Sequence, residues 1–426
     1  MKKIFLSLLL FVFPFLASAY DAEINGIYFN LIKKARIAEV TYGNTYAYNS
    51  YPEYYSINIP EKITYEGVEY SVTSIGNSAF NGCKDLHYIN IPNSISTIGE
   101  AAFSGCTNLL EVSIPNSVTS LKAHAFDGCS NLASISIPNT ISSIEDGLLA
   151  GCTSLVSVTF PDNVTRIGGS AFQNCKSLDY INIPNTVTYI GPCAFLGCSG
   201  LYNIIIPNSI SILYERTFEG CTNLKRVNIP NTIIIIGDYV FHQCSSLRYV
   251  TIPNNVIKLG IYSFNGCSSL KEIVIGKNVK EIGKNAFAGC HNLELVTSLP
   301  DNIPITHGDA FLNSYIEYAT LYVEESILNT YKNTMPWSQF GTILPIENVS
   351  GIEYYSNNEL RVFACNGLIN ISGLDESKQI AIYQTDGKQV ATAKAYNGSA
   401  SVATNISKGT PVIVKIGEKA VKVVMQ

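Results

Sequence analysis

The spacing of cysteine constrains this chain more than any other feature. Ten cysteines recur with a strict 23-residue period, each followed three positions later by leucine and preceded three positions earlier by phenylalanine, with Leu149 as the single substitute. A fixed period of about 20 to 50 residues indicates stacked units that bury their apolar side chains against neighbouring copies. The chain is therefore expected to fold as a solenoid. The ten cysteines are Cys83, Cys106, Cys129, Cys152, Cys175, Cys198, Cys221, Cys244, Cys267 and Cys290.

Each unit follows the consensus I-G-x-x-A-F-x-G-C-x-x-L-x-x-I-x-I-P-N-S-V-x-x. After the leucine, Ile89 and Ile91 alternate with Tyr88 and Asn90, which is typical of a short strand with one buried face that ends at Pro92. Because the period is short and constant, consecutive strands should lie parallel, about 4.8 Å apart, and form the concave face. The return path has apolar residues at steps of three or four, which favours a short helix or turn.

The glycine before each cysteine, as in Gly82, is expected to supply a positive φ, which Asn174 can tolerate. Gln243 at the same position departs from this rule.

We divide the chain into five segments. They are a signal peptide (1–19), an N-terminal β cap (20–70), ten repeats (71–299), a degenerate repeat with a C-terminal cap (300–347) and a small β-sandwich (352–426).

The segment from Met1 to Ala19 has the pattern of a secretory signal peptide. Lys2 and Lys3 precede an apolar run from Ile4 to Leu16, and Ala17-Ser18-Ala19 suits a signal peptidase. The alternative is a membrane anchor, but the run is shorter than the ~20 residues that span a bilayer, and no later stretch is long enough for a transmembrane segment. We expect a secreted or outer-surface protein.

The two ends of the repeat array should be capped. Residues 24–27 predict a hairpin near the N-terminus, and Thr320 to Val323 followed by Glu325 to Phe340 predict a last strand and an amphipathic closing helix. In the C-terminal segment about six strands are expected, including Gln379 to Gln384 and Gln389 to Lys394, which are joined across Asp386-Gly387.

The unit IGNSAFNGCKDLHYINIPNSIST resembles the leucine-rich repeats of bacterial BspA-like surface proteins, and the resemblance covers about residues 70 to 300. The resemblance implies an α/β repeat solenoid that forms a right-handed superhelix. It also implies an exported protein, because members of this family are exported or displayed on the surface, and some of them are adhesins. IYQTDGKQV and the final ISKGTPVIVKIGEKAVKVVMQ are similar to sorting tails of the type IX secretion system of Bacteroidota. Many such tails have an aromatic residue after the glycine, whereas Thr410-Pro411 follow Gly409 here. The alternative for this domain is an immunoglobulin-like spacer without a sorting role.

Composition and motifs argue against several function classes. Only 14% of residues are charged, the net charge is −5 and no basic run occurs, so a nucleic-acid partner is not expected. HExxH, GxSxG, P-loop and GxGxxG motifs are absent. Glu111 and Glu272 lie seven turns apart, roughly 34 Å, which is too far for a hydrolytic pair. We expect neither an enzyme nor a cofactor.

The cysteines and histidines are expected to be structural. The ladder cysteines should be buried free thiols, although stacked disulfides or a metal site are alternatives in an exported protein. Cys193 and Cys365 fall outside the ladder and also look structural. The five histidines occupy different repeat positions, which disfavours a metal site; they are His87, His124, His242, His291 and His307.

The outward positions of the concave strands are mostly Tyr, Asn, Ser and Thr, a composition that suits binding, although a merely solvated sheet would look the same. Lys225, Arg248 and Lys271 form a basic column whose mutual repulsion favours an anionic partner, such as a sulfated glycan or an acidic protein patch, unless Glu272 and Glu294 neutralise it. The candidate ligand-binding residues are Tyr88, Tyr180, Asn182, Tyr202, Lys225, Arg226, Asn228, Arg248, Tyr249 and Lys271.

An apolar patch of outward residues on the return path is either a contact surface for self-association or is covered by packing; it consists of Ile212, Ile234, Ile235 and Ile257. The sequence thus predicts an exported adhesin that binds an extracellular protein or glycan. The alternative is a structural cell-envelope component without a specific host ligand.

Overall fold

The computed structural model describes residues 20–43, 50–51, 54–346, 361–365, 368–372, 379–394, 399–404, 406–407, 410–417 and 419–424. The chain divides into two compact units, Met1–Leu321 with Asn329–Ile343, and Tyr322–Leu328 with Leu344–Gln426. The expected signal peptide lies outside the described residues. Within the part that is described, no helix is long and apolar enough to cross a membrane.

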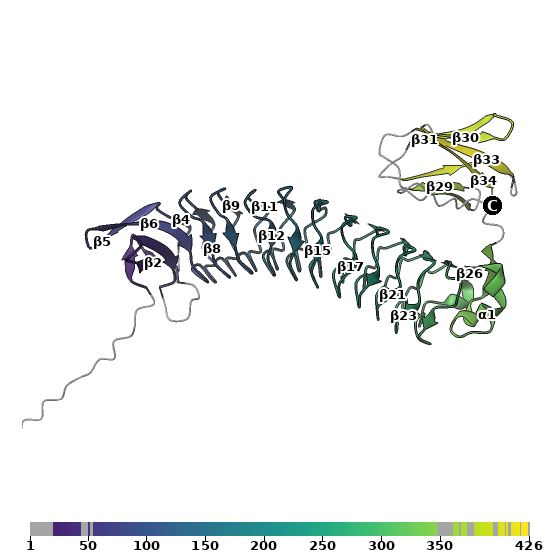
Figure 1. The fold of residues 1–426 in the computed structure, drawn as a ribbon, viewed down its shortest axis with the longest axis horizontal. Helices are drawn as coiled ribbons and strands as arrows, with labels where there is room; N and C mark the ends of the chain where they lie inside the picture. Colours follow the sequence, from purple (N-terminus) through teal and green to yellow (C-terminus); the bar gives the residue numbers. More distant parts are fainter. Residues whose placement is uncertain are drawn as a thin grey trace, which may run out of the picture. The chain divides into compact units, whose positions relative to one another are not determined.

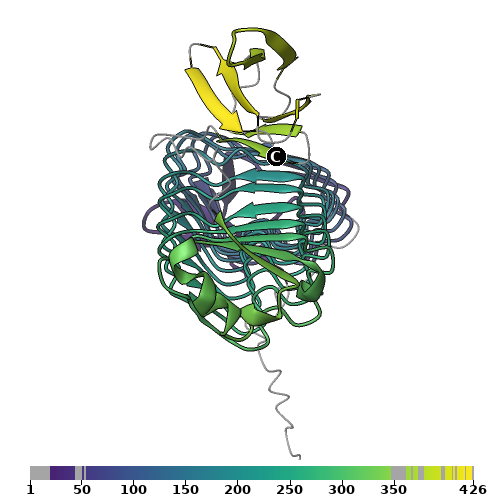
Figure 2. The same ribbon diagram turned by 90° about the vertical axis from the view of Figure 1, so that its right-hand side faces the viewer.

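The first unit is the expected solenoid, with stacked turns and two sets of short parallel strands (Figures 1 and 2). Where the strands pair, each joins the equivalent strand of the next repeat, as the strand with Tyr88 joins the strand with Glu111. The first set begins with β4 (Ser56–Asn58) of the N-terminal cap. Its other strands follow the repeat leucines and are β7 (Tyr88–Asn90), β9 (Glu111–Val112), β11 (Ser134–Ser136), β13 (Ser157–Thr159), β16 (Asn203–Ile205), β18 (Arg226–Asn228), β20 (Tyr249–Thr251), β22 (Glu272–Ile275) and β24 (Leu295–Ser298). We call the outward side of this set, with the residue just before each strand, the leucine-strand face.

The second set lies on the return path. It comprises β6 (Val68–Ile75), β8 (Thr97–Ile98), β10 (Ser120–Leu121), β12 (Ser143–Ile144), β14 (Arg166–Ile167), β15 (Tyr189–Ile190), β17 (Ile212–Leu213), β19 (Ile235–Ile236), β21 (Lys258–Leu259), β23 (Glu281–Ile282) and β25 (Ile305–Thr306). Glu281 pairs with Ile305, one position beyond the regular period, because one residue is inserted before the last turn.

The leucine-strand face is not the single continuous sheet that the repeat predicted. Its strands pair in the segments β4-β7-β9, β11-β13, β16-β18 and β20-β22-β24, and the last continues into β26 (Thr320–Val323) and β27 (Thr342–Pro345). The turn that carries Tyr180 and Asn182 forms no strand, which corrects the expectation for these two residues. The strands of this face have only two to four residues, so few ladder bonds join each pair.

The core of the first unit is a column of stacked phenylalanine rings. Phe195, Phe218 and Phe241 are fully buried, and neighbouring ring centroids lie 5.5 and 5.6 Å apart with planes within 8° of parallel. Leu149 interrupts the column, as the sequence indicates. Such offset stacks contribute about 0.5–1.5 kcal/mol per pair beyond the area they bury.

The ladder cysteines are buried free thiols, as predicted. Each thiol from Cys106 onward donates a hydrogen bond to a buried carbonyl of the preceding turn, as Cys106 Sγ does to Phe80 O at 3.1 Å and Cys198 Sγ to Phe172 O at 3.0 Å. Burial raises the pKa of these thiols, that of Cys175 to about 12. Cysteine thus fills a small apolar slot and also binds a carbonyl, which alanine could not. The Cys365 side chain lies outside the described residues.

The return path consists of turns and not of helices, because its N–H groups bond to the next turn. The N–H groups of Ser78, Phe80 and Gly82 donate to carbonyls of the following repeat at 2.7–2.8 Å. Gly82 has a φ of 69°, which confirms the prediction for the glycine before cysteine, and Asn174 and Gln243 adopt the same left-handed conformation at 59°. A second left-handed position, at Ser78 and its equivalents, is occupied by residues other than glycine in nearly every turn.

The N-terminal end is closed by strands that extend the first return-path sheet beyond β6. β1 (Ala22–Ile24) and β2 (Ile27–Ile32) form the predicted hairpin, β3 (Ile37–Thr41) pairs with β2 and with β6, and β5 (Lys62–Tyr65) pairs with β6. Tyr51 is fully buried and its ring lies 4.8 Å from that of Phe80, so it ends the aromatic column on this side.

The C-terminal end has the predicted strand β26, but the expected helix from Glu325 to Phe340 is broken. Only α1 (Leu328–Lys332) is helical, between the 3-10 turns η2 (Glu325–Ile327) and η3 (Trp337–Gln339), with a further turn η1 (Ile316–Tyr318) before β26. Pro336 lacks an N–H group and disfavours helix in the preceding residue, which explains the break. Trp337 is fully buried, 5.3 Å from the Phe311 ring, and ends the column here.

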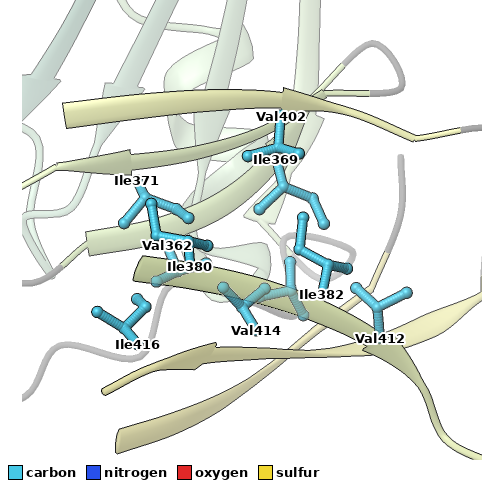
Figure 3. Packing of buried hydrophobic residues seen from close by; sticks show 10 residues of the cluster. Val362, Ile369, Ile371, Ile380, Ile382, Val402, Val412, Val414 and Ile416 are labelled. Atoms are coloured by element: carbon cyan, nitrogen blue, oxygen red, sulfur yellow. The ribbon is translucent and has the colours of Figure 1, made fainter. Parts of the chain in front are cut away.

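The second unit contains two antiparallel sheets that share a core of valine and isoleucine (Figure 3). One sheet has the order β28-β29-β32 and the other β31-β30-β33-β34. The hairpin across Asp386-Gly387 is confirmed, and Asp386 Oδ1 accepts a 2.9 Å hydrogen bond from the N–H of Lys388. The strands are β28 (Arg361–Cys365), β29 (Leu368–Ser372), β30 (Gln379–Gln384), β31 (Gln389–Lys394), β32 (Ser399–Ala403), β33 (Pro411–Ile416) and β34 (Lys419–Val424).

Candidate functional site

The leucine-strand face carries most of the candidate residues on or just before its strands. Tyr88 lies in β7, Arg226 and Asn228 in β18, and Tyr249 in β20. Tyr202, Lys225, Arg248 and Lys271 each directly precede a strand of this face. Tyr180 and Asn182 are exposed, in the turn without a strand.

The basic column begins with a cation–π pair. The Lys225 ammonium lies 4.7 Å from the centroid of the Tyr202 ring, and the N–H of Lys225 donates to Tyr202 O at 2.9 Å. Tyr202 still exposes 45% of its surface. An ammonium over a tyrosine ring at an exposed site gains about 0.5–1 kcal/mol, so this pair holds Lys225 in place without neutralising its charge.

The other end of the column is partly neutralised. Lys271 Nζ lies 2.7 Å from Glu294 Oε1 in the next turn, and the hydrogen bond and attraction to that carboxylate raise the pKa of Lys271. The predicted alternative of neutralisation by Glu294 is therefore realised for Lys271. Arg248 lies beside Lys271, bonded through the backbone, and its exposed guanidinium makes no ion pair or hydrogen bond with another described residue.

An aromatic cluster that the sequence reasoning missed lies at the other end of the same face. The rings of Tyr55 and His87 stack with centroids 4.3 Å apart, and the Tyr88 ring lies 5.6 Å from that of Tyr55. Electrostatic interaction with the adjacent Tyr55 hydroxyl, together with a hydrogen bond to it, raises the pKa of Tyr88. Only the register between β4 and β7, where Ser56 pairs with Tyr88, brings these residues together. The spacing from the N-terminal cap to the first repeat is irregular, so the repeat period could not supply that register.

The histidines make local contacts. His124 lies 3.4 Å from Asp127 and His307 2.6 Å from Asp309, while the Nδ1 atoms of His87, His242 and His291 bond to backbone carbonyls at 2.7, 3.1 and 2.9 Å. Within the described ranges, no group of three or more His, Cys, Asp or Glu residues could hold a metal ion.

The isoleucine patch on the return path is partly exposed. Ile234 and Ile257 expose 44% and 39% of their surface, whereas Ile212 and Ile235 pair between β17 and β19 and are half-buried. The patch is therefore narrower than the sequence predicted.

Comparison with known proteins gives a consistent picture. A model of the BspA type leucine-rich repeat region matches residues 73–202, 166–294 and 258–381. A leucine-rich repeat protein of Bacteroides ovatus is 28% identical, with a TM-score of 0.56, over 76% of each chain. A leucine-rich cell surface protein of Faecalibacterium prausnitzii is 23% identical, with a TM-score of 0.48, over 76% of this chain and 94% of its own. No curated protein matches the sequence.

The family model covers well over half of the chain. The matched residues contain the turns that show the 23-residue register, the buried cysteine ladder and most of the two sets of parallel strands. The chain belongs to the BspA-type leucine-rich repeat family.

Proposed function

We propose that this protein is exported and works at the outer cell surface as an adhesin, which binds an extracellular protein or glycan through the leucine-strand face. The signal-peptide pattern of residues 1–19 and the sorting-tail resemblance of residues 352–426 support export. The function requires neither catalysis nor a cofactor.

The observation that carries the proposal is the uneven compensation of the basic column. Glu294 neutralises the charge of Lys271. Among the described residues, the Lys225 ammonium has an aromatic partner but no ion pair, and Arg248 makes no ion pair either. Tyr202 and Tyr249, 45% and 56% exposed, flank these two cations. Exposed cations beside rigid aromatic rings suit an anionic partner, because the rings add contact area at a small loss of entropy.

The test is a binding screen of residues 20–426 against matrix proteins and against sulfated and neutral glycans. The variant Lys225→Glu/Arg248→Glu/Lys271→Glu should lose a salt-sensitive interaction. A control with the same change in charge, Lys122→Glu/Lys258→Glu/Lys280→Glu on the return path, should retain it. We expect Arg248→Glu alone to weaken binding more than Lys271→Glu.

Other outcomes would redirect the proposal. If binding of a matrix protein or a sulfated glycan survives the triple variant, the site would move to the Tyr and Asn residues of the same face, including Tyr88, Tyr180, Asn182 and Asn228. If no ligand binds at all, the structural alternative gains support.

That alternative is an envelope component that assembles with copies of itself, and the exposure of Ile234 and Ile257 favours it. Sedimentation of the wild type and of Ile234→Ser/Ile257→Ser over a range of concentrations distinguishes the two functions. Self-association that the double variant abolishes would support assembly, and a monomer at all concentrations would count against it.

A further inference from the structure

The aromatic cluster of Tyr55, His87 and Tyr88 lies apart from the basic column, five turns from Tyr202, or about 24 Å at 4.8 Å per turn. Tyr55 is 57% exposed although His87 stacks on one side of its ring. Tyr55 thus keeps more than half of its surface exposed beside its contacts with His87 and Tyr88. The backbone fixes the cluster, because Tyr55 O accepts hydrogen bonds from the N–H groups of His87 and Tyr88 at 2.9 and 3.3 Å.

Two exposed amides lie on the same strands as the cluster. Asn58 and Asn90 occupy paired positions of β4 and β7, and Asn90 Nδ2 donates a 2.5 Å hydrogen bond to Asn58 Oδ1. Each amide has two N–H donors and one carbonyl acceptor, so this bond orients the pair and leaves donors and acceptors for a ligand.

The charge beside the cluster is negative. Glu111 pairs with Tyr88 in the adjacent strand β9, and its exposed carboxylate contributes to the electrostatics of the Tyr88 phenol. A carboxylate accepts hydrogen bonds from hydroxyl groups and repels anions. The site therefore differs from the basic column in the charge of the ligand that it favours.

We propose that Tyr55, Tyr88, Asn58 and Asn90 form a binding site for a neutral carbohydrate chain. The apolar C–H face of a sugar ring packs on the exposed surface of Tyr55, and sugar hydroxyls bond to the two amides and to Glu111. This second site goes beyond the proposed function, which places recognition on the basic column.

In the test, residues 20–426 are titrated with neutral linear glucan, mannan and galactan oligosaccharides. Binding is measured by calorimetry and by saturation-transfer NMR. We expect saturable binding that is the same at about 0.15 M and 1 M salt, because no counterion release is involved. Tyr55→Ala should weaken it about tenfold, Tyr55→Phe should keep the ring contact and most of the affinity, and Asn90→Ala should weaken it less than Tyr55→Ala.

Two control variants complete the design. Tyr318→Ala removes a tyrosine that is 84% exposed and outside the cluster, and it should bind like the wild type. The charge-reversed Lys225/Arg248/Lys271 variant should also keep neutral-sugar binding, so this proposal and the proposed function can fail separately. The inference is overturned if no neutral oligosaccharide binds, or if a folded Tyr55→Ala protein binds them as the wild type does.

Discussion

The phenylalanine column predicts a measurable energetic coupling between neighbouring turns. Phe218 is fully buried and makes near-parallel ring contacts with Phe195 and Phe241 at 5.5 and 5.6 Å. Phe218→Leu removes both contacts, each worth about 0.5–1.5 kcal/mol, so we expect a loss of about 1–3 kcal/mol. Phe218→Ala also leaves a cavity and should cost about 3–5 kcal/mol.

Because a solenoid can open locally, the assay is amide hydrogen exchange, read peptide by peptide over the turns around Phe218. A double-mutant cycle of Phe195→Leu and Phe218→Leu isolates the ring contact, with an expected coupling of about 0.5–1.5 kcal/mol. Tyr318→Ala is the exposed control, which should change stability by less than about 0.5 kcal/mol. A coupling indistinguishable from zero would show that the rings only fill space.

Two further predictions concern the turns. Gly220 has a φ of 72°, and an added Cβ would meet Gly197 Cα at an ordinary 3.5 Å, so the cost of Gly220→Ala is backbone strain alone, about 1–2 kcal/mol by denaturant unfolding. Burial raises the pKa of Cys175 to about 12 from an unfolded value near 8.5, so unfolding releases a proton between these values. The free energy of unfolding should therefore fall as pH rises above about 8.5 under reducing conditions, and it should fall less steeply in Cys175→Ala. If its slope against pH were the same in both proteins, the burial of this thiol would be contradicted.

The parts of the fold that the sequence predicted depend on contacts between equivalent residues. The 23-residue period stacks each phenylalanine, cysteine and leucine on the equivalent residue of the neighbouring repeat. The burial of these residues and the parallel register of the strands therefore follow from the spacing alone. The hairpin across Asp386-Gly387 depends on turn chemistry between adjacent residues. Such local or strictly periodic information is visible in one sequence.

The parts that were missed depend on geometry between residues that are not equivalent. The left-handed position at Ser78 is occupied elsewhere by Ala101, Arg216 or Tyr239, so no residue type marks it. In the candidate site, the sequence could place the basic column, but which charges are compensated depends on side-chain reach, as in the pair of Lys271 with Glu294.

The bonds between turns have a consequence for how such chains change over generations. The thiol of one turn meets the same carbonyl of the turn before it throughout most of the array. A genetic duplication or deletion of one 23-residue unit therefore joins surfaces that already fit. The length of the solenoid can thus vary by recombination without a change in the core. The distance between the two ends of the leucine-strand face varies with that length.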